Sequence, residues 1–336
     1  MKRYSLIIFP LILLLSLTAC KNNSRFKVDA GSEVLKVKIN RFDSAFIAFD
    51  SSIPLASTQK LYGQYPQFMG VFVSDVLRED PNDSVKVSQA IAQFLSDTIF
   101  ANVNKKVSET FKDVSAIEAS ISESNQRIHF FFPQIKLPQL YFFVSGFNQS
   151  MVVHPDFIGI GLDMYLGSDF PIYKEIAYDY LTYNMRPESI PIDVISAILF
   201  NNFKIDISED RLLDNMLYRG KIMYILAVIM PQVEPNDLMG YTKFQWEWSR
   251  KYEQEIWNKM LDKSDIYSTD NLLIRKYLNE APFTTPISQE SPGRLGTWIA
   301  WQIVTSYMEK NKEITLVDLL KDNNYQKMLD NSGYKP

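Results

Sequence analysis

Two segments of the chain, residues 212–230 and 296–308, are apolar on nearly every face that a helix would present. A helix without a polar side has to be buried from all directions, so both segments belong in the interior of the fold. The first ends before Pro231, and the second follows the turn residues 291–294 (SPGR). Neither is long and charge-free enough to predict a membrane span, which needs about 20 apolar residues. The sequence therefore predicts a core that contains two buried helices.

The rest of the chain is also mainly helical in pattern. Apolar residues at three- and four-residue spacing predict helices through residues 54–132, then at 171–185, at 187–203 and on to the C-terminus. Ser115 and Glu118 have the spacing of a helix capping box. Short β-branched and aromatic runs predict strands, and these are residues 33–39, 140–144, 151–153 and 157–162. The expected fold class is α+β, mostly α-helical, with one small antiparallel sheet in the middle of the chain.

The N-terminus has the layout of a secretory signal. Lys2 and Arg3 are followed by an apolar run at residues 6–17, and small residues then lead into Cys20. This pattern is a lipobox, in which the signal is cut before the cysteine and the thiol takes a diacylglycerol. Cys20 is the only cysteine of the chain, whereas a secreted protein with structural disulfides normally carries an even number. We therefore expect Cys20 to be lipidated and to anchor the mature protein to a membrane, with several acyl chains supplying stable binding.

The predicted organisation has three parts. Residues 1–19 form the lipoprotein signal peptide, residues 20–33 form a lipidated polar tether, and residues 34–336 form a single globular domain. That domain can be divided into an N-terminal helical part, residues 34–135, and a sheet-plus-helix part, residues 136–336.

Charge and composition exclude several classes of function. Without Lys2 and Arg3, the 35 basic residues become 33 against 39 acidic residues, a net charge of −6. The charges are interspersed, so there is no electrostatic footprint for nucleic acid, and no nucleic-acid partner is expected.

The residues needed for common catalytic sites are missing from the sequence. After Cys20 the only histidines are His129 and His154, which are not spaced as the HExxH pair of a zinc protease. There is no GxSxG elbow, no free thiol and no phosphate-binding glycine loop. We therefore expect no metal, no cofactor and no enzymatic activity.

One carboxylate pair remains as a candidate. Glu175 and Asp179 are four residues apart on one predicted helix, so both would share a face. Such a pair can do acid–base chemistry, although an acidic face in solvent has the same spacing.

Cations inside the first buried helix need partners. Arg219 and Lys221 flank Gly220 in this apolar segment, and a buried cation has to be paired. Snorkelling to the surface is favoured for Lys221, and pairing with a carboxylate is favoured for Arg219. The candidate members of an interior polar network are Asp163, Glu175, Asp179, Asp214, Arg219, Lys221 and Arg294. Arg294 belongs to it because a cation near a helix start calls for an acidic partner.

Besides the lipobox, the chain carries a series of motifs, which are residues 41–43 (RFD), 142–167, 212–224 (LLDNMLYRGKIMY), 244–246 with 266–268, 281–284 (APFT), 291–308 and 332–336 (SGYKP). In their order along the whole mature chain, these features resemble the gliding motility lipoprotein GldB family. The resemblance implies a cell-envelope lipoprotein that is associated with motility and secretion machinery, and it carries over no catalytic residues.

A weaker likeness of layout is to HExxH-class zinc proteases, in which a sheet-proximal helix carries two histidines and a second helix carries a glutamate beside a glycine. Here residues 174–185 contain no histidine, and Arg219 stands before the glycine. The hypothesis that follows is a degenerate zincin-like fold, a metal-free pseudo-protease in which Arg219 and Lys221 fill the place of the ion.

The leading functional expectation is a non-enzymatic, membrane-tethered adaptor or structural component that contacts other envelope proteins. The alternatives are a metal-independent glycan or peptidoglycan hydrolase that uses paired carboxylates, and a small-molecule or lipid carrier with a deep apolar pocket. Lys21 follows the cysteine where a retention signal would have Asp, and residues 21–33 lack an acidic export cluster. We therefore expect an anchor in the outer membrane, facing the periplasm.

Overall fold

The computed structural model describes residues 24–28, 35–206 and 209–336. The predicted signal peptide, residues 1–19, and Cys20 lie outside these residues. The strands are β1 (Ile39–Arg41), β2 (Gln139–Phe143), β3 (Met151–Val153) and β4 (Phe157–Gly161).

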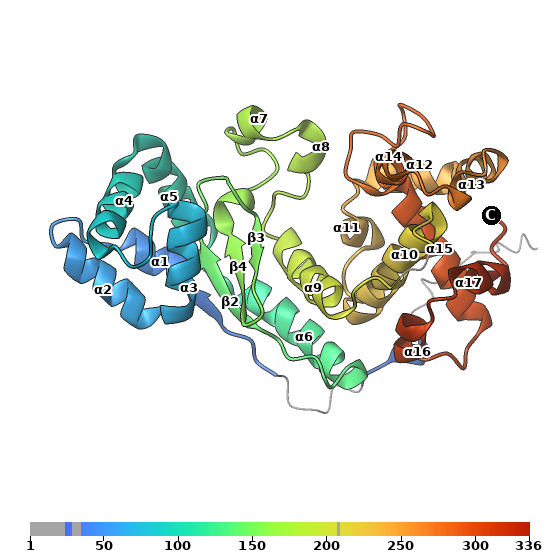
Figure 1. The fold of residues 1–336 in the computed structure, drawn as a ribbon, viewed down its shortest axis with the longest axis horizontal. Coiled ribbons are helices and arrows are strands. Elements are labelled where there is room, and N and C mark those ends of the chain that lie inside the picture. Colours follow the sequence, from blue (N-terminus) through green and yellow to red (C-terminus); the bar gives the residue numbers. More distant parts are fainter. Residues whose placement is uncertain (1–23, 29–34, 207–208) are drawn as a thin grey trace, which may run out of the picture.

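Helices make up most of the described chain (Figure 1), which confirms the predicted mostly helical α+β class. The N-terminal helices are α1 (Phe42–Ile47), α2 (Pro54–Gln64), α3 (Pro66–Val71), the π-helical turn η2 (Phe72–Leu77), α4 (Ser84–Ser96), α5 (Thr98–Thr110) and α6 (Ser115–Phe131). The middle helices are α7 (Tyr173–Ile176), α8 (Asp179–Thr182), α9 (Ser189–Asn202), α10 (Leu212–Ile229), α11 (Pro235–Met239), α12 (Lys243–Lys251), α13 (Glu253–Asp262) and α14 (Asn271–Leu278). The chain ends with α15 (Leu295–Lys310), α16 (Leu316–Lys321) and α17 (Tyr325–Ser332), and short 3₁₀ turns are η1 (Ser24–Phe26), η3 (Leu162–Met164) and η4 (Asp265–Tyr267).

The sheet is mixed, so the predicted antiparallel arrangement is wrong. The strand order is β1-β2-β4-β3, and only the β3–β4 pair is antiparallel. β1 runs parallel to β2, with Ile39 opposite Leu140, and β2 runs parallel to β4. β3 lies at the outer edge beyond β4, which leaves β4 free to pair with β2 in the same direction. The strand expected at residues 33–39 begins only at Ile39.

Both faces of the sheet are covered, which explains why β2 and β4 are almost continuously apolar. Tyr141, Phe143 and Phe157 point to one side and pack with aromatic residues of α1, α3 and η2. Alternate residues, among them Phe142 and Ile160, point to the other side and join the larger core with α5, α6, α9 and the C-terminal helices. Figure 1 shows α1–α5 beside the sheet at one end of the molecule and α6 and α9 on its opposite side.

The glycines of β4 serve packing. A Cβ on Gly159 would lie 2.8 Å from the ring of Phe68, which stacks on Tyr141 with ring centroids 4.8 Å apart. The missing side chain therefore makes room for an aromatic ring against the sheet.

The two apolar helices that the sequence places in the interior are α10 and α15, and they pack against each other. Gly220 of α10 faces the backbone of Ala300 in α15, where a Cβ would lie 2.6 Å from the carbonyl carbon and oxygen. Trp298 and Ile299 of α15 and Ile225 of α10 are fully buried. The prediction that both helices are buried is confirmed, and the mid-helix glycine allows their close approach. No helix within the described ranges has the length and apolarity needed to cross a bilayer.

Two local predictions are wrong. The expected helix 171–185 is interrupted at Ala177 and Tyr178, which are extended, so α7 and α8 are separate single turns. The capping box at Ser115 does not form, because Glu118 accepts a hydrogen bond from the Ile39 amide at 3.0 Å and pairs with Lys38. A tertiary contact to the incoming β1 segment thus replaces the local cap.

Part of the segment expected as a polar tether is packed on the body. Arg25 donates hydrogen bonds to the carbonyl of Met308, at 2.9 Å, and to that of Ile314. Phe26 is 9% exposed, and its ring meets those of Phe131 and Tyr224 edge to face. The chain is therefore already part of the folded body at residues 25 and 26.

Candidate functional site

The residues predicted to form one interior network lie in different parts of the fold. Asp163, in η3, is fully buried and accepts hydrogen bonds from the Ser145 amide at 2.8 Å, from the Ser145 hydroxyl at 3.0 Å and from the Phe147 amide. Burial raises the pKa of the Asp163 carboxyl, while these hydrogen bonds oppose the rise. Asp163 therefore ties the loop after β2 to the turn after β4.

Glu175 and Asp179 do not share a helix face. Glu175 lies in α7 and Asp179 begins α8, and both side chains are exposed. The acid–base pair predicted on one helix is therefore not present, and the solvent-exposed reading describes these carboxylates.

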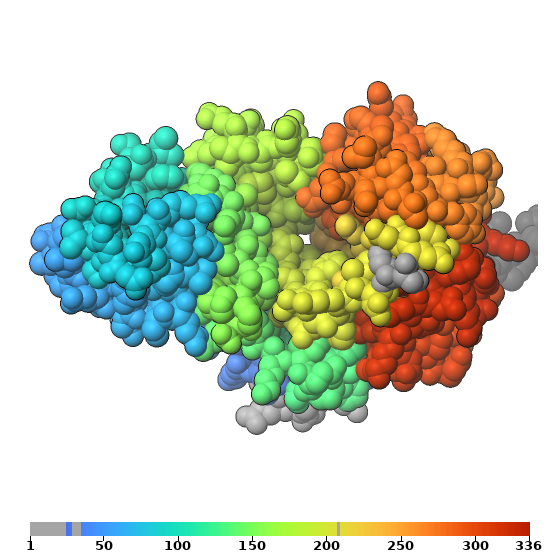
Figure 2. All heavy atoms as spheres, viewed as in Figure 1, coloured from blue at the N-terminus to red at the C-terminus, as the bar shows by residue number. Residues whose placement is uncertain are grey.

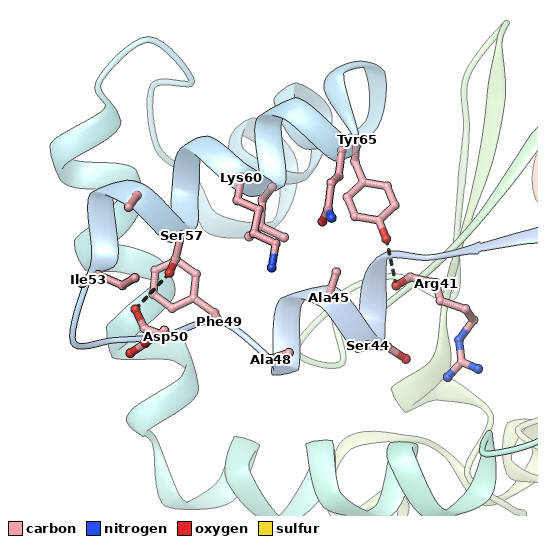
Figure 3. Close-up of a pocket in the computed structure, with 13 residues that line it drawn as sticks. Arg41, Ser44, Ala45, Ala48, Phe49, Asp50, Ile53, Ser57, Lys60 and Tyr65 are labelled. Atoms are coloured by element: carbon pink, nitrogen blue, oxygen red, sulfur yellow. Dashed lines mark hydrogen bonds between the residues drawn. The ribbon is translucent and has the colours of Figure 1, made fainter.

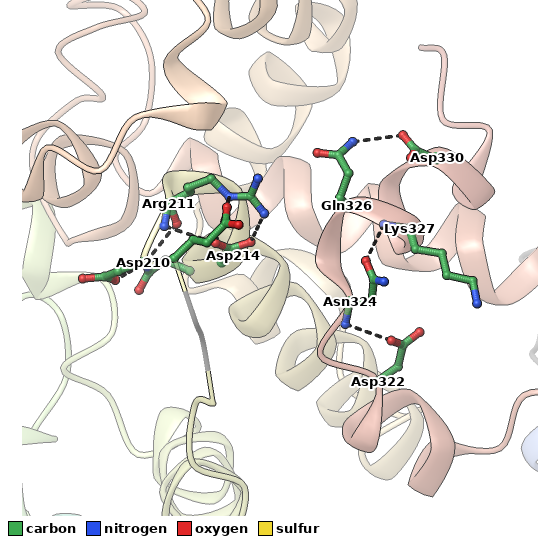
Figure 4. Close-up of polar contacts among 10 residues, drawn as sticks. Asp210, Arg211, Asp214, Asp322, Asn324, Gln326, Lys327 and Asp330 are labelled. Carbon is green, nitrogen blue, oxygen red and sulfur yellow. Dashed lines mark hydrogen bonds and ion pairs between the residues drawn. The ribbon is translucent and has the colours of Figure 1, made fainter.

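Asp214 is the partner of Arg211 and does not pair with Arg219. The Arg211 guanidinium donates to both carboxylate oxygens of Asp214, at 3.0 and 3.1 Å, while Asp214 also accepts from the Arg211 amide (Figure 4). This arrangement closes the start of α10, where a negative charge suits the helix dipole.

Lys221 stays inside the protein, so its predicted snorkelling is wrong. The residue is 1% exposed, and its ammonium donates to the carbonyls of Asp322, at 2.9 Å, and of Leu320, at 3.3 Å. It also lies 4.7 Å from the ring centre of Tyr325. These groups cap the end of α16, near the turn drawn on the right of Figure 4. Burial lowers the pKa of Lys221 to about 8.

Arg219 also lacks the carboxylate partner predicted for it among the described residues. Its guanidinium donates to the carbonyl of Leu278, at the end of α14, at 2.8 Å. Burial and the nearby Arg294 lower its pKa. Since residues 171–185 are not one helix and no acid holds Arg219, the geometry gives no support to a metal-free zinc-protease descendant.

Arg294 links three elements at the start of α15. It has a left-handed conformation, with φ of 61°, and donates to the carbonyl of Met239 at 3.2 Å. The carboxylate of Glu280 lies 3.6 Å from the same guanidinium. Behind it, the buried Thr284 hydroxyl accepts from the Leu295 amide at 3.2 Å, which satisfies the helix N-terminus.

Asp193 is a second acid of this region, and it was not among the residues predicted from the sequence. It lies in α9 and accepts a hydrogen bond of 2.8 Å from the buried Tyr165 hydroxyl. The pKa of Asp193 is raised to about 6, mainly by burial; Glu280 contributes to the rise, and the Tyr165 hydrogen bond and Arg294 oppose it. We call Tyr165, Asp193, Arg219, Glu280 and Arg294 the central polar cluster. It brings together α9, α10 and the start of α15.

A signal for Asp193 was present in the sequence. It is an acid within the apolar run at residues 190–199 (IPIDVISAIL). A charged group in such a run needs a buried partner, as Arg219 does in its own apolar helix. Tyr165 and Glu280 lie in irregular segments, and only the fold brings them near Asp193.

The space beside the central polar cluster is small. A pocket of about 30 Å³ is lined by Tyr180 and Asn184 on one side and by Tyr241, Glu280 and Arg294 on the other. Figure 2 shows that this face of the molecule is hollowed between the α8–α9 region and the C-terminal helices. The pocket has room for a water molecule. The described residues contain no group of three or more His, Cys, Asp and Glu side chains placed to hold a metal ion.

Two larger surface depressions share no lining residue with this pocket. A groove of about 670 Å³ lies between α1 and α2, where Lys60 points toward α1 and the Tyr65 hydroxyl donates to the Arg41 carbonyl (Figure 3). Its lining is about equally polar and apolar. A second groove, of about 560 Å³, is lined by aromatic residues of α12 and its end, which are Phe244, Trp248 and Tyr252. Grooves of this kind suit extended peptide segments or exposed side chains of a partner.

The fold and these sites define a mostly helical α+β protein in which the buried charges hold helices together. The chain belongs to the gliding motility protein GldB family, whose family model matches residues 23–336. No curated protein and no solved structure matches the chain. The family places the protein among the lipoproteins associated with gliding motility.

Proposed function

We propose that this protein is a lipid-anchored, non-enzymatic adaptor of the cell-envelope machinery that serves gliding motility. The match to the family over residues 23–336 is the observation that carries the proposal. The anchor is a diacylglycerol on Cys20, held in the outer membrane, and the folded body faces the periplasm. The partners are other envelope proteins of the motility or secretion machinery.

The contacts of the buried charges support an adaptor. Asp214 closes the start of α10, Lys221 caps α16, and Arg219 holds the end of α14. Each of these groups has a structural partner, and the pocket beside the central polar cluster is too small for a sugar ring. The two surface grooves offer more room, and both lie on helices that a partner can reach.

Crosslinking in the native cell tests the adaptor role. A photo-crosslinking residue replaces Ile53, which lines the α1–α2 groove and is 55% exposed, and a matched control replaces Ile99 of α5, which is 61% exposed. The proposal expects a discrete adduct with an envelope protein from position 53 and none from position 99. Equal labelling from both positions, or no adduct from position 53 or from Phe244 of the second groove, contradicts an adaptor that uses these grooves. Cys20→Ser should release the protein from the membrane fraction.

A further inference from the structure

We propose that the C-terminal end of α6, with Phe130 at its tip, rests against the lipid bilayer that holds the N-terminus. This inference rests on the lipid anchor at Cys20 in the proposed function. It adds an orientation, because it names the face of the body that meets the membrane and the residue that enters the interface.

The length of chain between the anchor and the body limits how far the body can move away. Arg25 is five residues after Cys20, and it is already hydrogen-bonded to the carbonyls of Met308 and Ile314. Five residues span at most about 17 Å when fully extended. The headgroup region on each side of a bilayer takes up several ångströms of that length. The part of the body that holds Arg25 and Phe26 therefore lies close to the membrane surface.

Aromatic contacts connect Phe26 to the tip of α6. The ring centroids of Phe26 and Phe131 lie 5.9 Å apart, and those of Phe131 and Phe130 lie 5.0 Å apart. Phe130 is the outermost member of this chain of rings and is 60% exposed. Figure 1 shows the end of α6, the segment at residues 24–28 and α16 along the same lower edge of the molecule.

The end of α9 lies beside the same site. Phe203, which follows α9, packs on Phe132 with ring centroids 5.1 Å apart. Ile205 is 39% exposed, and Lys204 is exposed between these two residues. The surface around Phe130 therefore continues into a second element with an apolar and a basic side chain.

The chemistry of this surface suits a lipid interface. An exposed phenylalanine gains free energy by entering the boundary between headgroups and acyl chains. Lys27, Lys136 and Lys204 are exposed on the segments that surround it, and ammonium groups there can meet lipid phosphates. Exposure alone does not select this face, since Phe244 on α12 is 76% exposed. Phe130 is selected because its ring is linked through Phe131 to Phe26, which lies six residues after Cys20, whereas Phe244 has no such link within the described residues.

Depth-dependent quenching tests the orientation. The mature lipidated protein is placed on vesicles of phosphatidylethanolamine and phosphatidylglycerol that contain a lipid with a nitroxide on its acyl chain. Cys20 is the only cysteine and its sulfur carries the lipid, so Phe130→Cys supplies the one free thiol for a fluorophore. Phe244→Cys is the matched control, because it replaces an exposed phenylalanine on α12, at the opposite edge in Figure 1. Circular dichroism verifies that both variants are folded.

The expected result is quenching by the lipid nitroxide that is at least about twofold stronger at position 130 than at position 244, since interfacial side chains reach only about 5–10 Å into the boundary. Aqueous iodide should show the reverse order. If the protein floats with the vesicles but both labels respond alike, the orientation is wrong and the anchor stands. If mass spectrometry finds no lipid on Cys20 and the protein does not float, the anchor and this inference fail together.

Discussion

The close contact between α10 and α15 leads to a prediction that can be worked out in detail. Gly220→Ala places a Cβ 2.6 Å from the carbonyl carbon and oxygen of Ala300 and 2.9 Å from its Cβ. Normal contacts between such atoms are about 3.5–4.0 Å, so the helices have to separate locally by roughly 1 Å. Two of the three nearest atoms belong to the backbone, and no side-chain rotation can relieve that clash.

Two effects of opposite sign decide the magnitude. Alanine is favoured over glycine in a helix interior by about 1 kcal/mol. Overpacking a buried interface costs about 1–3 kcal/mol, and the backbone contact places Gly220 at the upper end of that range. The free energy of unfolding should therefore fall by about 2 kcal/mol.

Urea unfolding, followed by circular dichroism, measures this change. The protein is the mature chain with Cys20→Ser, so that lipid does not interfere. Gly70→Ala is the matched control, because Gly70 lies in α3 and a Cβ there meets nothing within 4 Å. The control should raise the free energy of unfolding by about 0.5–1 kcal/mol. A urea midpoint of Gly220→Ala equal to or above that of the wild type, with the control behaving as expected, would refute the predicted backbone clash.

Three further predictions concern single side chains. The pKa of Lys221 falls to about 8 on folding, so between pH 8 and 10 the unfolded chain holds a proton that the folded chain has lost. The stability of the wild type relative to Lys221→Met should therefore rise over this interval. A constant difference in urea midpoint would contradict this. The pKa of Asp193 is raised to about 6, so the folded protein holds its proton more tightly than the unfolded chain, and wild-type stability relative to Asp193→Asn should fall as the pH rises from about 4 to about 6. Unfolding at a series of pH values checks the direction, and a rise over this interval would refute it. Phe26→Ala removes the ring that packs between Phe131 and Tyr224. Tryptic cleavage after Arg25 and Lys27 should become faster, while the circular dichroism spectrum stays unchanged. An unchanged cleavage rate would show that Phe26 does not hold the segment against the body.

The sequence predicted the elements whose pattern is strong and local. Residues 212–230 and 296–308 lack a polar face, and burial on all sides is the only arrangement that satisfies such helices. The mostly helical class followed from apolar spacing over long segments. The sequence shows Gly220 inside the first of these segments, but its packing partner Ala300 could not be named from one chain.

The pairing of strands that are far apart in the sequence could not be predicted from local apolar patterns. β1 pairs with β2 across about 100 residues, and β3 turns outward beyond β4, so spacing between neighbouring runs gave the wrong sheet type. The break at Ala177 and Tyr178 has no proline or glycine to mark it. Here the tertiary environment decides between conformations that local propensity leaves nearly equal.

The candidate site was predicted only in part. Their place in an apolar helix marked Arg219 and Lys221 as cations that need partners, but the prediction for each was wrong. Lys221 is buried and does not reach the surface, and backbone carbonyls at helix ends hold both side chains where a carboxylate was expected for Arg219. A sequence shows which side chains can accept a hydrogen bond, whereas every residue offers a carbonyl. Partners of that kind become visible only when the helix ends are placed.

The attachment of Arg25 and Phe26 has a mechanical consequence. Tension applied at the anchored N-terminus enters the body at these two residues and is passed to α6, α10 and the end of α15. β1 begins at Ile39, thirteen residues beyond Phe26, and is not under tension until the contacts of Arg25 and Phe26 break. Once these contacts break, the connection can lengthen by about 35–40 Å, because the next attachment is the hydrogen bond from the Val37 amide to Ser122 of α6, eleven residues beyond Phe26. The strength of the Arg25 and Phe26 contacts would then set the force at which a short, stiff connection between membrane and body becomes a long, flexible one.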